Sequence, residues 1–199
     1  MARRGDHNKE ELKKLAIQAG VEIIEQYGYF GFSARAVAAK MGYTVGTLYH
    51  VFGTLDDFML HINATTLDLW YDTLQRGLKR HKGDAVHYLA KSYLQFANKH
   101  YNRWSALFEH RLAEGNKIPD WYAPKMSRFF VLAEDALLEH VNHDTKKAAK
   151  MGKVLWASIH GVCVLALSGK LVAVGAESAE SLVSALVDNT LAGLKKTSF

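Results

Sequence analysis

The sequence predicts an all-α protein in which three short helices are followed by longer ones. Apolar residues recur three and four positions apart along most of the 199 residues, which is the spacing of helices with one buried face. No segment alternates apolar and polar residues over the length of a strand. The two prolines, Pro119 and Pro124, lie close together, so the rest of the chain is free to form helices.

Charge and cysteine content set weak limits on the function. The formal net charge is +5, which suits an acidic partner such as DNA. Residues 1–60, however, hold seven Lys or Arg and seven Asp or Glu, so the excess positive charge lies downstream. Cys163 is the single cysteine, and the polar start MARRGDHNKEE lacks the apolar core of a signal peptide. We therefore expect a cytoplasmic protein without an internal disulfide.

The first helices can be placed by their end signals. Apolar residues at helical spacing predict a first helix that ends near Tyr27, before Gly28. Ser33 is expected to cap a second helix over 34–41, and Gly42 to end it. Thr44 is expected to cap a third helix over 45–51, and Thr54 to open the next one.

The rest of the chain predicts longer helices, about nine in total with the first three. Gly83, Gly115 and the stretches 142–144 and 172–177 separate them. The expected ranges are 55–80, 84–100, 102–114, 121–141, 145–171 and 178–195. We divide the chain into a first domain over residues 1–53 and a second domain over residues 54–199.

The segment around Gly42 has the residue types of a helix-turn-helix. The close crossing of two helices needs a small side chain, which Ala38 supplies, and the turn needs a residue that tolerates a left-handed backbone, which Gly42 supplies. Apolar residues at the right spacing fill the space between the helices, namely Val37, Met41, Leu48 and Val51. The alternative is a plain helical hairpin with a glycine turn.

The outward face of the third helix then becomes the candidate DNA-reading surface. The stretch GYTVGTLYHVF contains no Lys and no Arg, but Thr and Tyr hydroxyls can bond phosphates and base edges. The outward residues are Tyr43, Thr44, Gly46, Thr47, Tyr49 and His50. Arg35 is a candidate phosphate contact, and Arg3 and Arg4 are candidates for an arm in the minor groove, the alternative being a solubilising tail.

The stretch YGYFGFSARAVAAKMGYTVGTLYHVFGTLDDF resembles the DNA-binding domain of the tetracycline-repressor (TetR/AcrR) family of bacterial regulators. The resemblance covers residues 10–60, with Gly46-Thr47-Leu48-Tyr49 and Phe52 at its core. It implies that Ser33 and Tyr49 contact phosphates and that Thr44, Gly46, Thr47 and His50 enter the groove. Leu55 stands where the family usually has a phosphate-binding Lys, so the resemblance does not carry that phosphate contact over to this chain.

The C-terminal part resembles one subgroup of that family, through the signature residues Trp156, His160 and Gly161. The resemblance implies a homodimer whose two C-terminal helices form a four-helix bundle with those of the partner. The apolar stripes of these helices agree with it, and the expected interface residues are Ile159, Val162, Leu182 and Leu186. The apolar run 154–169 is short for a bilayer, so we expect no membrane span.

The middle helices are rich in aromatic rings. By resemblance this region would enclose a pocket for a small hydrophobic or aromatic effector, whereas the simpler reading is that the rings form core. The expected pocket residues are Phe96, Trp104, Phe108, Trp121, Phe130, Trp156 and His160.

Other chemistry finds little support. His160 and Cys163 are three residues apart on a helix, but two ligands do not make a metal site, and no phosphate loop or activated nucleophile is present. We therefore expect no enzyme activity, no cofactor and no metal. The sequence favours a dimeric, ligand-responsive DNA-binding regulator, a repressor that an effector releases from a palindromic operator. The alternative is an all-α small-molecule binding protein with an inactive DNA-binding head.

Overall fold

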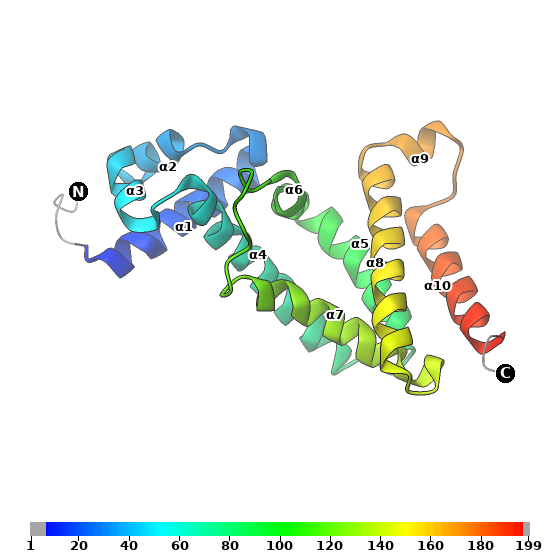
Figure 1. Ribbon diagram of the computed structural model, residues 1–199. Helices are drawn as coiled ribbons and strands as arrows, with labels where there is room; N and C mark the ends of the chain where they lie inside the picture. Colours follow the sequence, from blue (N-terminus) through cyan, green and yellow to red (C-terminus); the bar gives the residue numbers. More distant parts are fainter. Residues whose placement is uncertain (1–6, 197–199) are drawn as a thin grey trace. The chain divides into compact units, whose positions relative to one another are not determined.

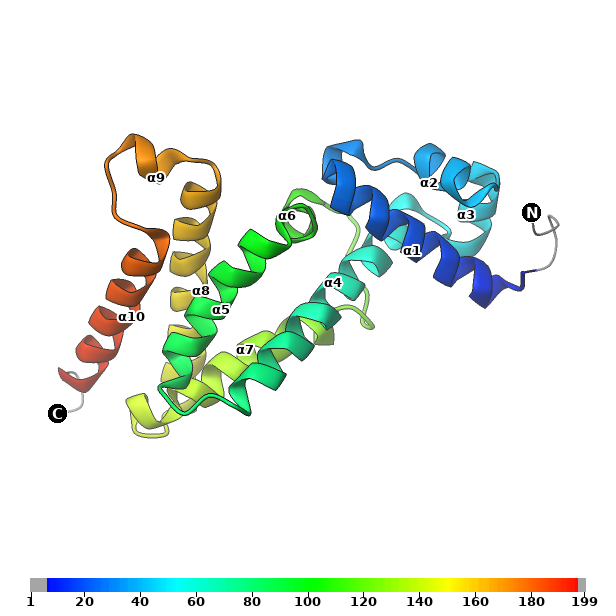
Figure 2. The same ribbon diagram turned by 180° about the vertical axis from the view of Figure 1, so that it is seen from behind.

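The computed structural model describes residues 7–196, and within this range all regular secondary structure is helical, as predicted (Figures 1 and 2). Arg3 and Arg4 lie outside the described residues. Ten α-helices and two short 3₁₀ helices follow one another along the described chain. They are α1 (Lys9–Tyr27), η1 (Tyr29–Gly31), α2 (Ala34–Met41), α3 (Val45–Phe52), α4 (Leu55–Leu78), α5 (Ala85–Lys99), α6 (Tyr101–Glu109), α7 (Ala123–Leu137), η2 (Leu138–Val141), α8 (Thr145–Leu167), α9 (Lys170–Ala173) and α10 (Ala179–Lys196).

The helices form two compact units, each built from two stretches of chain. The first unit contains residues 1–69 and 100–123, and the second contains residues 70–99 and 124–199. The expected division after residue 53 differs from these units, because α4 continues the first unit to Leu69 and α6 returns to pack on α1.

The first unit is held together around α1. A capping box starts this helix: the Asn8 side chain accepts from the backbone N–H of Glu11, and the Glu11 carboxylate accepts from the backbone N–H of Asn8. Its buried face includes Ala16 and Ile24, at 0% and 1% exposure. Arg103 of α6 donates to the Glu25 carboxylate and to two threonine hydroxyls of α4, and so ties three helices together.

The second unit packs α5, α8 and α10 against one another. Figures 1 and 2 both show α8 and α10 side by side. Asp144 caps α8 by accepting from the backbone N–H of Lys147, and the helix buries Leu155, Ile159 and Cys163. Among the described residues α8 has the length and apolar composition of a membrane span, a test that the core helix of a soluble protein also meets.

The structure corrects three details of the sequence prediction. The helix expected over 102–114 ends at Glu109, and the helix expected over 145–171 ends at Leu167. The second break follows from Gly169, whose φ of 72° cannot continue a right-handed helix. Thr44 occupies the N-cap position of α3, but its hydroxyl lies 3.2 Å from the Thr47 hydroxyl instead of capping a backbone N–H.

Candidate nucleic-acid interface

Residues Ser33 to Phe52 form a helix-turn-helix within the first unit. The Ser33 hydroxyl accepts from the backbone N–H of Ala36 at 3.1 Å, which starts α2 as predicted. Gly42 ends α2 with φ 73° and ψ 24°, and the N–H of Tyr43 closes the turn on the Ala38 carbonyl at 2.9 Å. This left-handed conformation is the reason that the turn needs glycine.

The inner face of α3 fixes the helix to the unit. Leu48 and Phe52 are 3% and 8% exposed, and the Phe52 ring stacks on Phe58 of α4 with centroids 4.4 Å apart. Val37 and Ala38 of α2 are buried in the same core. The residues chosen from the sequence as the packing face of the motif are therefore buried or half-buried.

The outer face of α3 is open to solvent. Gly46, Tyr49 and His50 are exposed, as is Thr44 at the start of the helix, whereas Tyr43 and Thr47 are half-buried. A Cβ added at Gly46 would meet only the Thr44 hydroxyl, at 3.7 Å. The helix backbone is thus accessible at this point, so another molecule can approach it closely.

His7 was not expected at this surface. Its Nδ1 lies 2.7 Å from the Tyr43 hydroxyl, which fixes the start of the described chain beside the turn of the motif. No spacing in the sequence indicated this contact, because it joins residues 36 positions apart.

Charges around the motif are partly neutralised. Lys40 of α2 pairs with Glu22 of α1 at 2.9 Å, and hydrogen bonds from Lys40 and Gln18 lower the pKa of Glu22. Arg35 is exposed, and among the described residues it makes no ion pair, so its guanidinium is available to an anion. Ser33 is also exposed, beside it at the N-terminus of α2, where helix geometry favours anions.

The expected effector-pocket residues fall in both compact units. Trp104, Phe108 and Trp121 belong to the first unit, and the other four belong to the second. Within the first unit, Trp104 contacts Phe108, whereas Trp121 stacks on His61 of α4 at 4.3 Å.

The second unit contains a cluster of rings around His160. Its ring stacks on Trp156, its Nδ1 lies 2.7 Å from the Tyr93 hydroxyl, and Trp156 contacts Phe130. Burial lowers the pKa of His160, which favours the neutral imidazole. Phe96 stacks on Trp70 instead, at 4.8 Å.

Trp70 is a member of this ring system that the sequence did not single out. Its indole is 6% exposed, and its Nε1 has no hydrogen-bond partner within the described part of the chain. A buried N–H without an acceptor is costly, so this atom marks a place where an acceptor would be stabilising.

His160 and Cys163 differ in their surroundings. Burial raises the pKa of the Cys163 thiol to about 11, so the sulfur stays protonated at neutral pH, and the side chain is 1% exposed. Among residues 7–196 no three His, Cys, Asp or Glu side chains come together as a metal-binding group.

A helix-turn-helix with one buried and one open face is the arrangement that many DNA-binding helical regulators use. Residues 16–62 match the family model described as bacterial regulatory proteins, tetR family, and residues 86–190 match the model of the tetracyclin repressor-like C-terminal domain. The chain therefore belongs to the tetracycline-repressor family of transcriptional regulators, and its N-terminal part is the family's DNA-binding domain.

Individual relatives agree with this assignment. The chain is 34% identical over 79 residues to uncharacterized HTH-type transcriptional regulators of Mycobacterium bovis and Mycobacterium tuberculosis, a match that covers 40% of this chain and 37% of the relatives.

Solved structures share the fold. A protein of unknown function from Rhodococcus sp. RHA1 superposes with a TM-score of 0.73 at 17% identity, over 97% of this chain and 98% of the other. A tetR-family transcriptional regulator from Streptomyces coelicolor gives 0.64 at 15% identity, over 94% and 82%. The regulator FadR from Bacillus subtilis, in complex with stearoyl-CoA, gives 0.58 at 14% identity, over 90% and 98%.

Proposed function

We propose that this protein is a homodimeric, cytoplasmic repressor that binds a palindromic operator through α3 and is released by a small hydrophobic effector. The observation that carries the proposal is the division of α3 into two faces. Leu48 and Phe52 hold the helix in the core, while Tyr49, His50 and Gly46 are left in solvent. A helix fixed by one face and open on the other suits insertion into the major groove.

The DNA contacts follow from the chemistry of the open face. Hydroxyls of Thr44, Thr47 and Tyr49 would bond phosphates and base edges, and the bare backbone at Gly46 would allow close approach. Ser33 and Arg35 would hold phosphates at the N-terminus of α2. Tyr43 and His50 complete the reading surface, and Arg3 and Arg4 supply a minor-groove arm.

Dimerisation would use the exposed sides of α8 and α10. Apolar and small residues of α8 that stay exposed in the single chain include Val154, Ala157, Gly161 and Val164. Ile159 is 6% exposed and packs inside its own unit, so it offers little surface to a second copy. Val162, Leu182 and Leu186 are half-buried and remain interface candidates.

An isologous dimer would place two reading helices on one side of the DNA. Half-sites one helical turn apart, about 34–36 Å, would then be read by the two α3 helices. This geometry is the reason for expecting a palindromic operator.

The effector would occupy the ring system of the second unit. Tyr93, Trp156 and His160 offer an apolar surface with few polar atoms, and the unpartnered Nε1 of Trp70 would bond an acceptor. FadR, a structural relative, is in complex with stearoyl-CoA, whose acyl chain is apolar. We therefore propose an apolar effector with at least one hydrogen-bond acceptor, bound without turnover.

The experiment is the capture of sheared genomic DNA from the source organism by the purified protein, followed by sequencing. Tyr49→Ala removes an exposed tyrosine from α3, and Tyr101→Ala, the matched control, removes an exposed tyrosine from α6 of the same unit. The proposal expects a few fragments with a shared near-palindrome, lost with Tyr49→Ala and kept with Tyr101→Ala.

A second function is tested by the same experiment. If only salt-sensitive background is captured, either DNA binding requires a co-ligand or the DNA-binding head is inactive, and the second case favours an all-α small-molecule binding protein. Enrichment that survives both Tyr49→Ala and Thr47→Ala would contradict the assignment of α3 as the reading helix.

A further inference from the structure

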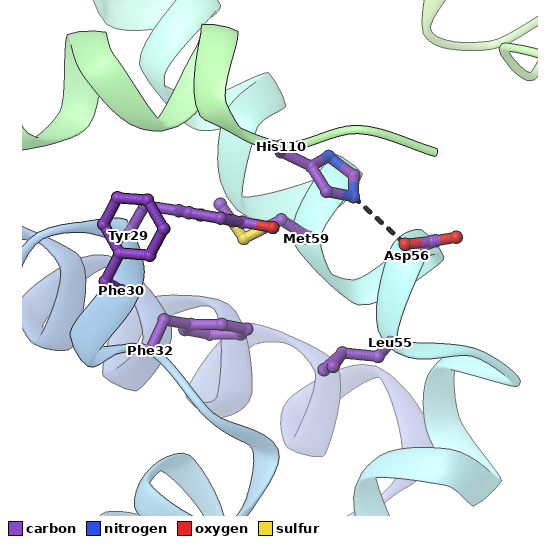
Figure 3. Close-up of a pocket in the computed structure, with 7 residues that line it drawn as sticks. All are labelled: Tyr29, Phe30, Phe32, Leu55, Asp56, Met59 and His110. Atoms are coloured by element: carbon purple, nitrogen blue, oxygen red, sulfur yellow. Dashed lines mark hydrogen bonds and ion pairs between the residues drawn. The ribbon is translucent and has the colours of Figure 1, made fainter. Parts of the chain in front are cut away.

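The first unit contains a cavity that the proposed DNA contacts do not use. It has a volume of about 230 Å³ and lies between the η1 segment, the start of α4 and the residue that follows α6 (Figure 3). Its residues come from parts of the chain that are far apart in sequence, from Tyr29 to His110. The ring system around His160 belongs to the other unit, so this cavity is separate from the proposed effector site.

Three aromatic rings form one side of the cavity, those of Tyr29, Phe30 and Phe32, and Met59 lines it from α4. The Phe30 ring is 87% exposed although it is fully apolar, so its position is not explained by burial in the folded chain. Tyr29 and Phe30 meet edge to face with centroids 5.6 Å apart. Such a group of rings offers both apolar contact and negatively polarised faces.

A carboxylate faces the rings. Asp56 accepts from Nε2 of His110 at 3.1 Å, from the backbone N–H of Ala113 at 3.2 Å and from the side-chain amide of Asn116 at 3.4 Å. These hydrogen bonds, that of His110 first, lower the pKa of Asp56, so the group is ionised at neutral pH. An ionised carboxylate has about four acceptor positions, so three donors leave roughly one for a further partner.

The charge of Asp56 acts on the aromatic side of the cavity. Burial raises the pKa of Tyr29, and the negative charges of Asp56 and Glu109 raise it further. Figure 3 shows the Tyr29 hydroxyl pointing toward the side of the cavity on which Asp56 and His110 lie. The side chain of Asp56 is 28% exposed, so a partner can reach it from the cavity mouth.

We propose that this cavity binds a small organic cation with a single aromatic ring, the ring against Tyr29, Phe30 and Phe32 and the positive charge beside Asp56. The size fits this class, because a protein cavity of about 150 Å³ accommodates benzene, and the additional volume here takes a short cationic group. Aromatic faces together with a carboxylate are the surroundings that stabilise an organic ammonium ion.

The site has a direct connection to the helix-turn-helix. Phe32 immediately precedes Ser33, which caps α2, and Leu55 and Asp56 follow Gly53, which ends α3. A bound cation would thus contact both connections that flank the motif. A change in DNA affinity on binding rests on the proposed function, whereas the binding itself does not.

The test uses the full chain with ¹³C-methyl methionine labelling and benzyltrimethylammonium as the probe. The Met59 methyl should shift on titration while the other methionine methyls do not, because Met59 lines the cavity. Benzyl alcohol, a neutral probe of similar ring size, should bind about threefold to thirtyfold more weakly, the range expected when cation–π and charge contacts are lost.

Two variants separate the contributions of the aromatic ring and of the carboxylate to binding of the cation. Phe30→Ala should leave the fold intact, since the ring is exposed, and should weaken binding of the cation; Tyr101→Ala is the matched control and should bind like the wild type. Asp56→Asn should weaken the cation but not benzyl alcohol.

The proposal is overturned if the Met59 methyl does not respond to millimolar benzyltrimethylammonium, if benzyl alcohol binds equally well, or if Phe30→Ala binds like the wild type. Should Asp56→Asn fail to fold, the Phe30→Ala result still decides. These outcomes are independent of DNA capture, so a failure of this site and a failure of the proposed function are distinguishable.

Discussion

Gly42 and Gly46 stand four residues apart in the helix-turn-helix, and alanine should change stability in opposite directions at the two positions. Gly42 has φ 73°, and an added Cβ would meet no atom within 4 Å. The cost of Gly42→Ala is therefore conformational, about 1–2 kcal/mol for a left-handed residue. Alanine also lowers the conformational entropy of the unfolded chain, which offsets roughly 0.4–1 kcal/mol of this cost. The net change is a loss of about 1 kcal/mol in the free energy of unfolding.

Gly46 lies inside α3 with an ordinary helical backbone, and its added Cβ would meet only the Thr44 hydroxyl at 3.7 Å, which is normal contact. Replacing a helical glycine with alanine stabilises by roughly 0.5–1 kcal/mol. Gly46→Ala should therefore be more stable than the wild type.

Urea unfolding followed by circular dichroism measures the two changes. Hydrogen exchange at the amides of α2 and α3 should accompany it, because the two compact units can unfold in separate steps. Gly42→Asn is the control and should lie between Gly42→Ala and the wild type, since asparagine tolerates the left-handed region. A Gly42→Ala protein as stable as the wild type, or a Gly46→Ala protein less stable than the wild type, would contradict this prediction.

The Gly42→Ala and Gly46→Ala variants also distinguish an effect on stability from an effect on DNA affinity. The new methyl of Gly46→Ala stands on the open face of α3, where it would hold the helix backbone away from DNA. We expect this variant to be more stable and yet to bind DNA more weakly, as measured by titration of a captured fragment. Unchanged DNA affinity would mean that Gly46 does not approach the DNA.

Three further predictions concern His87, Leu48 and Gly161. Both ring nitrogens of His87 contact carboxylates, at 2.8 Å from Asp84 and 2.9 Å from Asp188, which requires an imidazolium. Burial opposes the charge, but these hydrogen bonds raise the pKa of His87, so its stabilisation is complete below about pH 6.5 and is lost as the pH rises through the raised pKa. Urea midpoints should fall over that interval, and His87→Gln should remove this part of the pH dependence. Leu48→Ala should cost about 2–5 kcal/mol in thermal or urea unfolding, because the side chain is 3% exposed and anchors α3. Gly161→Glu should leave the single chain folded, since its Cβ meets no atom within 4 Å, but should shift sedimentation from dimer to monomer.

For each of these three variants, one result would contradict the prediction. A His87→Gln protein with the same pH profile as the wild type would show that the imidazolium does not stabilise the fold. A loss below 1 kcal/mol for Leu48→Ala would mean that α3 is held elsewhere. A Gly161→Glu protein that remains dimeric would place the interface away from this side of α8.

The helix-turn-helix was predictable because its signals are local. The Ser33 hydroxyl caps α2 by accepting from the backbone N–H three residues further along the chain. Gly42 adopts the left-handed conformation that the turn requires, and Leu48 lies on the buried face that its spacing predicts. Each feature depends on neighbours within a few positions, so the sequence specifies it without knowledge of the tertiary fold.

Features that depend on distant residues were not predictable. The helix expected over 102–114 ends at Glu109, and the segment that follows is fixed by Asp56 through His110, Ala113 and Asn116. No periodicity in the sequence reports a contact between residues more than fifty positions apart.

The expected effector-pocket and dimer-interface residues also depended on contacts with distant parts of the chain, which local sequence patterns do not report. Aromatic residue type does not distinguish a pocket wall from core, so the expected pocket residues fell in two units, and Trp70, with its unpartnered Nε1, was missed. Helical spacing indicated that Ile159 is buried, but not that its own unit, rather than a second copy, covers it.

If α3 reads DNA as one of a symmetric pair, the protein should protect two symmetric patches of its operator. A hydroxyl-radical footprint of the wild-type protein on a captured fragment measures this protection. We expect two protected patches about one helical turn apart, about 34–36 Å centre to centre, both lost with Tyr49→Ala and both kept with Tyr101→Ala. Protection that is unchanged by Tyr49→Ala, or a single patch without a symmetric second one, would contradict it.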